Sequence, residues 1–430
     1  MISVSRLKSD VSSFSTLQGS SMIESAVDSS LNGAFSSKPR YGDMRTGMDQ
    51  NSAEPVIFRW FPEFRGRIPW VDLGLQPTPI EPLPGFGHGN LWIKRDDRSS
   101  SIYGGNKIRK LEFSLGEALQ QGKKRVVTFG AIGTNHGLAT AIFCDILGLD
   151  CTILLFDQPV TLNVKNNLWH LCSTHADIVY KQSLFRTVLD YFVKQRVRFL
   201  STYFLAPGGS NTVGTIGYVN AALELKEQVD CGLMPEPACI FCPVGSSGTM
   251  AGLLLGCQLA GLETTVVGVR VSLSHFGPFA VCTAGAIRKL AQQTYRYLKD
   301  RSPNLPEVSI PAPVLLDEYL GAGYGHPTLA GGDAHEQMKT RKGISLDPCY
   351  TSKAFAAALD HCRKDQDQRR SILFWNTYNS VELPQPVAAS DQIGISPELR
   401  AFLNRSETVG YPEHDPKPRK RRSADPMKQL

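Results

Sequence analysis

A lysine behind two glycines is the most informative feature of the chain, because residues 104–110 read Gly-Gly-Asn-Lys-Ile-Arg-Lys. Before this stretch, residues 91–97 read Leu-Trp-Ile-Lys-Arg-Asp-Asp, which predicts a strand that runs into a polar loop. After it, apolar residues recur at helical spacing as far as Gly122, so a helix is predicted to begin at about Lys107. A lysine held there beside apolar groups and other cations can lose its proton and attack a carbonyl carbon to form a Schiff base. An ordinary surface lysine in a basic helix start is the alternative.

A second loop, at residues 245–249, reads Gly-Ser-Ser-Gly-Thr and joins an apolar run to a helix of small residues. The run at 238–244 predicts a buried strand, residues 250–260 predict a helix, and residues 264–271 predict another strand. Free backbone N–H groups and hydroxyls at such a helix start form an anion site. The loop lacks the lysine of a nucleoside-triphosphate loop and does not match the dinucleotide pattern, so it suits a phosphate monoester. A flexible loop without a ligand is the alternative.

An activatable lysine and a separate phosphate loop together match the two requirements of pyridoxal phosphate, an amine for its aldehyde and a site for its phosphate. The chain resembles the fold-type II pyridoxal-phosphate enzymes, and within them the 1-aminocyclopropane-1-carboxylate deaminase/D-cysteine desulfhydrase family. The similarity covers residues 68–384. It rests on five stretches: residues 94–97 with 103–107; 129–136; 206–210 with Gly214, Gly217 and Tyr218; 245–249; and 346–353.

The resemblance implies an α/β fold of the tryptophan synthase beta type, with two open parallel-sheet domains and the cofactor between them. Alternating strands and helices agree with this fold; they are predicted at 126–129, from 138, at 151–156, 164–175, 199–205 and 213–228. Residues 294–313 show no clear pattern. The catalytic region would span 53–404, with a small domain at about 108–225 inserted in a large domain formed by about 53–107 and 226–390. A homodimer is also implied.

The resemblance assigns roles to individual residues. Lys107 would hold the cofactor and later move the substrate proton. Asn135 would bind the phenolic oxygen of the cofactor, and Thr134 stands where the family has a serine near the substrate carboxylate. Tyr324 and Tyr350 would lie against the reacting carbon. The phosphate would be held by Gly245, Ser246, Ser247, Gly248 and Thr249. His136 replaces a glutamine, and its role stays open.

Thr351 bears on the reaction, because the aminocyclopropane deaminases have a glutamate there, beside the pyridine nitrogen. A carboxylate keeps that nitrogen protonated and strengthens the electron sink, whereas a hydroxyl does not. The resemblance therefore implies α,β-elimination on a small amino acid, as in D-cysteine desulfhydrase, giving a 2-keto acid and ammonia. Aminocyclopropane deamination is the alternative, and residues 375–379, where Tyr-Asn replaces a glycine pair, leave the substrate open.

Two other classes of function remain open from the residues alone. One is an enzyme whose 245–249 loop binds a different phosphorylated ligand while Lys107 is structural. The other is a non-catalytic protein that keeps the cofactor-binding fold. A lyase or deaminase is favoured because the lysine and the phosphate loop occur together.

Composition agrees with a cytoplasmic enzyme of 430 residues, 42% of them hydrophobic. No apolar run is long enough to cross a membrane, and ten scattered cysteines suit reduced thiols. Cys239 and Cys242 would face opposite sides of a strand, so no metal site is predicted. Disorder is predicted for the Ser-rich residues 1–52 and for the tail at 405–430, whose basic run at 417–422 is a weak nuclear signal. Residues 411–430 hold six Lys/Arg against three Asp/Glu, half of the net charge of +6, so nucleic-acid binding is not expected.

Overall fold

The computed structural model describes residues 54–87, 89–193, 195, 200–276, 279–365, 369–383 and 395–407. The predicted extension at 1–52 and the basic run at 417–422 lie outside the described residues. No helix within these ranges is both long enough and apolar enough to cross a membrane.

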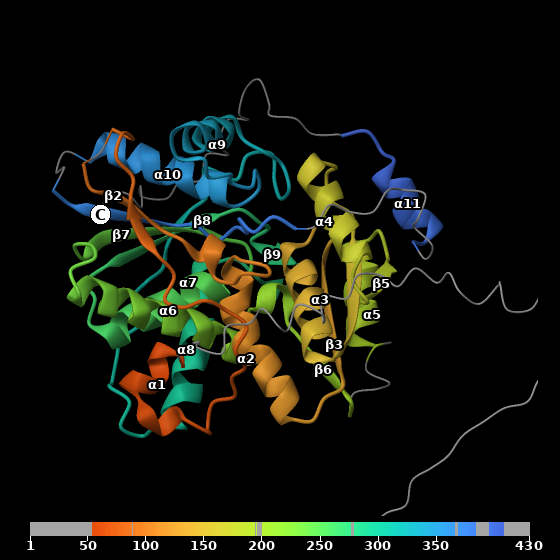
Figure 1. Cartoon of the computed structure of the whole chain (residues 1–430), viewed down its shortest axis with the longest axis horizontal. Coiled ribbons are helices and arrows are strands. Elements are labelled where there is room, and N and C mark those ends of the chain that lie inside the picture. The colour runs from red at the N-terminus through yellow and green to blue at the C-terminus, as the bar shows by residue number, and fades with distance from the viewer. Residues whose placement is uncertain are drawn as a thin grey trace, which may run out of the picture. The chain divides into compact units, whose positions relative to one another are not determined.

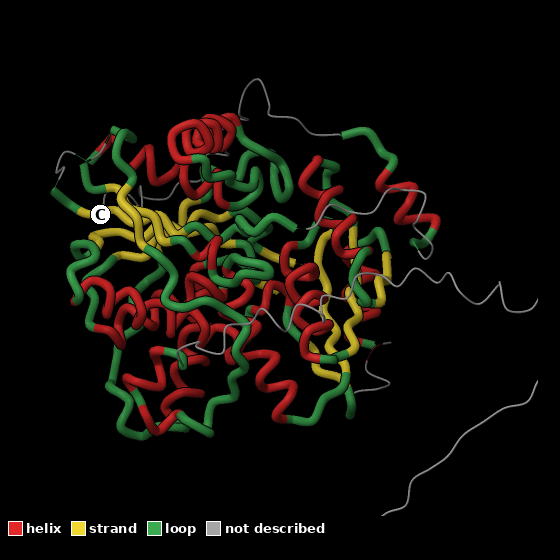
Figure 2. Tube along the Cα trace, in the orientation of Figure 1, coloured by secondary structure: helices red, strands yellow, loops and turns green. Residues whose placement is uncertain are grey.

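A six-stranded sheet forms the centre of one half of the fold (Figures 1 and 2). Its strands pair in parallel except for the first, β1, which is antiparallel to β2. Their order is β1 (Ile80–Pro82), β2 (Leu91–Lys94), β12 (Ser371–Trp375), β7 (Pro237–Val244), β8 (Thr265–Arg270) and β11 (Val314–Leu316).

Helices cover both faces of this sheet, as Figure 1 shows. One face packs against α9 (Leu329–Lys342) and α10 (Thr351–Lys364). The other face packs against α1 (Val56–Trp60), α6 (Thr212–Asp230), α7 (Gly248–Ala260) and α8 (Ala284–Lys299). Cys239 belongs to the first core and Cys242 to the second, which confirms that they point to opposite sides of β7.

The second sheet has four parallel strands, and its order is β5 (Asp177–Tyr180), β4 (Asp150–Phe156), β3 (Arg125–Ala131) and β6 (Thr202–Phe204). The helices that pack around it are α3 (Asn135–Leu147), α4 (Leu162–Cys172), α5 (Leu184–Phe192) and α11 (Pro397–Leu403), with α2 (Asn106–Gln120) contributing to the same core. A short hairpin of β9 (His275–Phe276) and β10 (Phe279–Ala280) follows β8.

The predicted α/β class with two parallel sheets is confirmed. The predicted alternation of strands and helices is also confirmed, with small shifts at the ends. Helix α3 begins at Asn135 rather than at 138, because the Thr134 side chain caps it. The prediction left residues 294–313 unassigned, and helix α8 extends into them as far as Lys299. Helix α6 packs in the core of the six-stranded sheet, and the predicted domain bounds stay a prediction.

Candidate active site

A cavity of about 280 Å³ brings together most of the residues singled out in the sequence. The start of α2, the start of α3 and the loop between β7 and α7 each form part of its wall. Helices α2 and α7 follow strands of the six-stranded sheet, so their starts point free N–H groups toward the same side of it, and α3 follows β3 of the four-stranded sheet. The predicted site residues that line the cavity are Lys107, Thr134, Asn135, Gly245, Ser246, Ser247, Thr249, Tyr324 and Tyr350. Gly248 and Thr351 were predicted at the site as well, but they do not line the cavity.

The glycine pair before Lys107 allows close contact between backbones. Gly105 has φ +97°, and a Cβ on it would lie 2.9 Å from the Thr377 carbonyl oxygen. A Cβ on Gly104 would lie 2.0 Å from the carbonyl oxygen of Asp97. A larger residue at position 105 would therefore push the start of α2 away from the loop after β12, and one at position 104 would push it away from Asp97. The two glycines thus allow Lys107 to lie in the wall of the cavity.

The Lys107 amine is set up to react as a nucleophile. Its Nζ donates a hydrogen bond to Asn106 Oδ1 at 2.9 Å. Burial lowers the pKa of Lys107 to about 8, although the charge of Asp347 opposes the shift. A larger share of neutral amine is thus available than for an exposed lysine.

The rate at which the apoprotein captures pyridoxal phosphate should therefore rise with pH up to about 8 and then level off, since only the neutral amine of Lys107 attacks an aldehyde. Stopped-flow absorbance after mixing, at a series of pH values, measures this rate. A free lysine derivative in the same buffers is the control, and its capture rate should keep rising beyond pH 9 because its pKa is about 10.4. A protein profile that rises in parallel with the control would contradict the lowered pKa.

Asp347 lines the cavity and was missed by the sequence interpretation. Its carboxylate accepts hydrogen bonds from the backbone N–H groups of Cys349, Tyr350 and Thr351, at 3.0, 2.6 and 3.0 Å. Thr351 Oγ1 donates to the same carboxylate at 2.6 Å and is fully buried. The cavity wall thus presents the Asp347 carboxylate, to which Thr351 donates a hydrogen bond. In the sequence, the signal for it is an aspartate four residues before the first residue of α10.

The two predicted tyrosines form a pair. Tyr324 and Tyr350 bring their hydroxyl oxygens to 2.9 Å, with ring centroids 6.2 Å apart. Burial raises the pKa of Tyr324 to about 12, and it also raises the pKa of Tyr350 well above its usual value. Both phenols therefore keep their protons at neutral pH and can donate hydrogen bonds. Tyr378 and Asn379 also line the cavity, so the predicted Tyr-Asn pair lies at the site.

The loop at 245–249 packs against a second loop at 206–210. Ser246 Oγ lies 2.8 Å from Ser210 Oγ, and the backbone N–H of Gly248 donates to Ser210 Oγ at 3.1 Å. Ser247 takes a left-handed conformation with φ +72°, which directs the first turn of α7 toward the cavity. The first N–H groups of a helix have no partner within the helix, so this wall suits a phosphate.

Lys110 is a second lysine beside these two loops that the sequence interpretation did not assign, although it does not line the cavity itself. It lies one turn after Lys107 on α2, and its Nζ donates to the Gly208 carbonyl at 3.2 Å and to Ser210 Oγ at 3.3 Å. Burial, with a contribution from the charge of Lys107, holds the pKa of Lys110 well below its usual range. An anion beside it would favour the charged form and so gain binding energy.

Gly248→Asp should weaken the binding of pyridoxal phosphate by about a hundredfold, because a carboxylate at the start of α7 repels the phosphate. A Cβ at this position would also lie 2.6 Å from Ser210 Oγ and 3.1 Å from Lys110 Nζ, so the loop would shift. Absorbance titration gives the affinity, and thermal unfolding of the apoprotein tests the fold. Gly232→Asp, at a glycine with open space around it, is the control. Equal affinity in both variants would place the phosphate elsewhere.

The start of α3 carries the remaining predicted residues. Thr134 Oγ1 accepts a hydrogen bond from the Gly137 N–H at 3.0 Å, so its hydroxyl caps the helix. Asn135 Oδ1 accepts from Asn167 at 2.6 Å, which holds the amide in place. His136 is buried; its Nε2 lies 3.0 Å from Thr128 Oγ1, and its Nδ1 has no partner. Burial and the two lysines lower the pKa of His136, so the ring is neutral.

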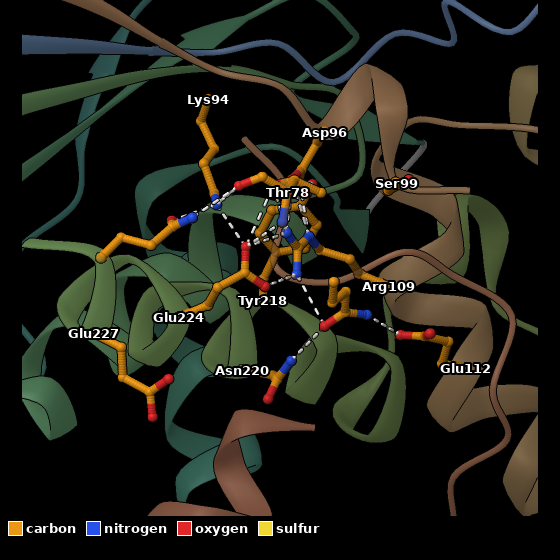
Figure 3. A network of polar contacts seen from close by, with 12 residues as sticks. Thr78, Lys94, Asp96, Ser99, Arg109, Glu112, Tyr218, Asn220, Glu224 and Glu227 are labelled. Carbon is orange, nitrogen blue, oxygen red and sulfur yellow. Dashed lines mark hydrogen bonds and ion pairs between the residues drawn. The ribbon is translucent and has the colours of Figure 1, made fainter. Parts of the chain in front are cut away.

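A buried ionic network holds the start of α2 in position (Figure 3). Arg109 forms ion pairs with Asp96 at 2.8 Å and with Glu224 of α6 at 2.9 Å, and all three side chains are buried. Trp375 Nε1 donates to Asp96 at 2.6 Å, and Tyr218 donates to Asp96 at 2.7 Å. The Asp96 carbonyl oxygen accepts from the Gly105 N–H at 2.8 Å. The position of Lys107 thus depends on contacts with three other elements.

Comparison with known proteins agrees with this geometry. The family model described as "Pyridoxal-phosphate dependent enzyme" matches residues 71–377. The chain belongs to this family of enzymes. The predicted cofactor, pyridoxal phosphate, is confirmed, and so is the assignment of the chain as an enzyme. The amine of Lys107 and the anion wall at 245–249 fit the aldehyde and the phosphate of this cofactor.

Relatives of this pyridoxal-phosphate enzyme support the predicted resemblance. A Thermotoga maritima protein, named as a candidate 1-aminocyclopropane-1-carboxylate deaminase, is 32% identical over 71% of this chain and 95% of its own. A crystal structure described as an "ACC deaminase homologue" matches this chain with a TM-score of 0.64 at 30% sequence identity. The match covers 76% of this chain and 95% of the homologue. Threonine deaminase isoform 2 from Solanum lycopersicum shares the fold, with a TM-score of 0.52 at 16% identity over 80% of this chain and 88% of its own.

Proposed function

We propose that the enzyme is a lyase that cleaves a small amino acid by α,β-elimination and releases a 2-keto acid and ammonia. The observation that carries this proposal is the half-buried Lys107, whose amine has its pKa lowered to about 8, in the same cavity as the 245–249 loop. By the family resemblance, Thr351 in place of a glutamate supports elimination over opening of a cyclopropane ring. Thr351 does not itself line the cavity, and its hydroxyl donates to Asp347, which does. D-cysteine represents the expected substrate type.

The residues of this chain have separate tasks in such a reaction. When bound, pyridoxal phosphate withdraws electrons from the substrate α-carbon. Lys107 removes the α-proton at its Nζ, because Tyr324 and Tyr350 keep their protons and are poor bases. The N–H groups at the start of α3, near Thr134 and Asn135, bind the substrate carboxylate. Tyr324 and Tyr350 donate hydrogen bonds to the leaving group.

Deamination of 1-aminocyclopropane-1-carboxylate is the second candidate. The support for it is the name of the Thermotoga maritima relative, together with Asp347, which provides a carboxylate in the cavity wall. Asp347, and not Thr351, lines the cavity, and a carboxylate beside the ring nitrogen would strengthen the electron sink that ring opening needs.

Turnover of a panel of small amino acids separates these functions. We expect D-cysteine to be consumed at least about tenfold faster than 1-aminocyclopropane-1-carboxylate, because thiolate is a better leaving group than a ring carbon. Keto-acid release from both enantiomers of cysteine and of β-chloroalanine, and from the cyclic substrate, is measured with the purified holoenzyme. Rapid opening of the cyclic substrate without consumption of cysteine would reverse the assignment. No turnover of any member would favour a non-catalytic protein.

The homodimer and the cytoplasmic location remain part of this proposal. Eight of the ten cysteines are buried, and all ten lie scattered over separate elements, which supports a reducing compartment. Light scattering on the purified protein and microscopy of the tagged chain test these two points.

A further inference from the structure

The side of the cavity formed by the four-stranded sheet is apolar. Leu184 and Val188 lie four residues apart on one face of α5, and both line the cavity while remaining half-buried. Phe129 and Phe156 line it from the carboxyl-terminal ends of β3 and β4. The Phe129 ring packs against Tyr191 of α5 at a centroid distance of 5.0 Å, so these residues form one connected surface.

The part of the wall formed by the segment after β8 is apolar as well and is more exposed. Leu273 and Val281 line the cavity, and they are 54% and 38% exposed. Two hydrogen bonds tie their segment to the phosphate loop: Ser272 Oγ donates to the Gly245 carbonyl at 2.5 Å, and Ser247 Oγ donates to the Val281 carbonyl at 2.7 Å. The side chains of Leu273 and Val281 are thus held at the opening, where a ligand that covers them would gain free energy from the buried apolar surface.

Few charges face this opening. Apart from tyrosines, the ionisable side chains among the described lining residues are Lys107, His136, His275 and Asp347. Lys107 and Asp347 have tasks at the reacting centre, and His136 is neutral. The described part of the wall contains no arginine, and Lys107 is its one lysine. A second carboxylate on a substrate would therefore lose water with only the exposed His275 among the described lining residues left to pair with it, which is costly.

From this we infer that the substrate carries an uncharged apolar group on its β-carbon substituent, as in S-alkyl or S-aryl cysteines. The inference rests on the proposed lyase function and adds its substrate class. The apolar group would lie at the opening, against Leu184 and Val188 and against Leu273 and Val281. The amino and carboxylate groups would lie deeper, at Lys107 and the start of α3.

The reaction balances for such a substrate. The electrons of the Cα–H bond form the Cα=Cβ bond, and the Cβ–S bond breaks with its electron pair on sulfur. Lys107 takes the proton, and the departing thiolate is protonated to the alkyl thiol. Water then hydrolyses the resulting enamine, after it tautomerises, to pyruvate and ammonia. The sum is S-alkylcysteine plus water giving alkyl thiol, pyruvate and ammonia, without an oxidant or reductant.

The test compares S-butylcysteine with S-(2-carboxyethyl)cysteine and S-methylcysteine in the holoenzyme, using the enantiomer that is turned over. All three release alkyl thiolates, so they differ chiefly in size and charge. We expect kcat/KM for the butyl compound to exceed both others by at least about tenfold. Leu273→Lys should lower the ratio of butyl to carboxyethyl turnover by about tenfold or more, because it supplies a cation. Leu233→Lys, which is 56% exposed outside the cavity, should leave the ratio unchanged.

The outcomes separate this inference from the proposed function. Turnover of β-chloroalanine with equal kcat/KM for butyl and carboxyethyl cysteines would overturn the inference and leave the lyase in place. A Leu273→Lys enzyme with an unchanged ratio would overturn the placement of the group at the opening. Absence of keto acid from every amino acid would overturn the proposed function and the inference with it.

Discussion

Lys107→Ala is expected to lower turnover by at least ~10⁴-fold while the protein stays folded, because the variant lacks both the amine that holds the cofactor and the base that moves the proton. Neighbouring groups cannot replace it. Tyr324 has its pKa raised to about 12, and Lys110 is engaged with Gly208 and Ser210. The expected loss therefore exceeds that of any other single substitution at the site.

The measurements are keto-acid release, retention of pyridoxal phosphate and trapping of the cofactor by borohydride. The variant should still bind the cofactor through the 245–249 loop, but reduction should leave no cofactor attached to the chain. Lys124→Ala is the matched control, since it removes an exposed lysine just beyond α2 and should keep full activity. Substantial activity in Lys107→Ala would refute the assignment, and trapping at another lysine would relocate it.

Arg109→Met should destabilise the protein by about 3–5 kcal/mol, because it leaves the buried carboxylates of Asp96 and Glu224 without their partner. Arg109 and Lys94 lower the pKa of Glu224 to about 2 in spite of its burial, so this group stays charged. An unpaired charge at this depth is far more costly than the lost hydrogen bonds alone. Activity should fall as well, since the network holds the start of the helix that carries Lys107.

Denaturant unfolding at pH 7 measures the change in stability. The control is Arg59→Met, which removes an exposed ion pair of 2.5 Å between Arg59 of α1 and Glu227 of α6, the helix that also carries Glu224. This variant should lose less than about 1 kcal/mol of stability. If Arg109→Met cannot be purified, Glu224→Gln provides a milder test, because it keeps the shape and removes one charge. A loss no larger than that of Arg59→Met would show that the network contributes little.

Local features of the sequence were sufficient to predict the helix starts near Lys107 and after the 245–249 loop, and the strand–helix alternation. The roles of Lys107 and of this loop stay predictions. The glycine pair before Lys107 and the small residues around 245–249 mark helix starts, which depend on neighbouring residues. Apolar runs such as 238–244 predict buried strands because both faces must be covered. The resemblance then added Asn135, Tyr324 and Tyr350, and the fold brings all three to one cavity with Lys107.

Only the tertiary structure decided which polar groups meet in the interior. Asp96 and Trp375 are 279 positions apart and share a hydrogen bond of 2.6 Å, and no local pattern encodes such a contact. Asp347 lines the cavity and Thr351 does not. The turn before α10 fixes the Asp347 carboxylate, because the backbone N–H groups of Tyr350 and Thr351 donate to it. The lowered pKa of Lys107 has the same origin, since burial depends on every segment that covers the amine.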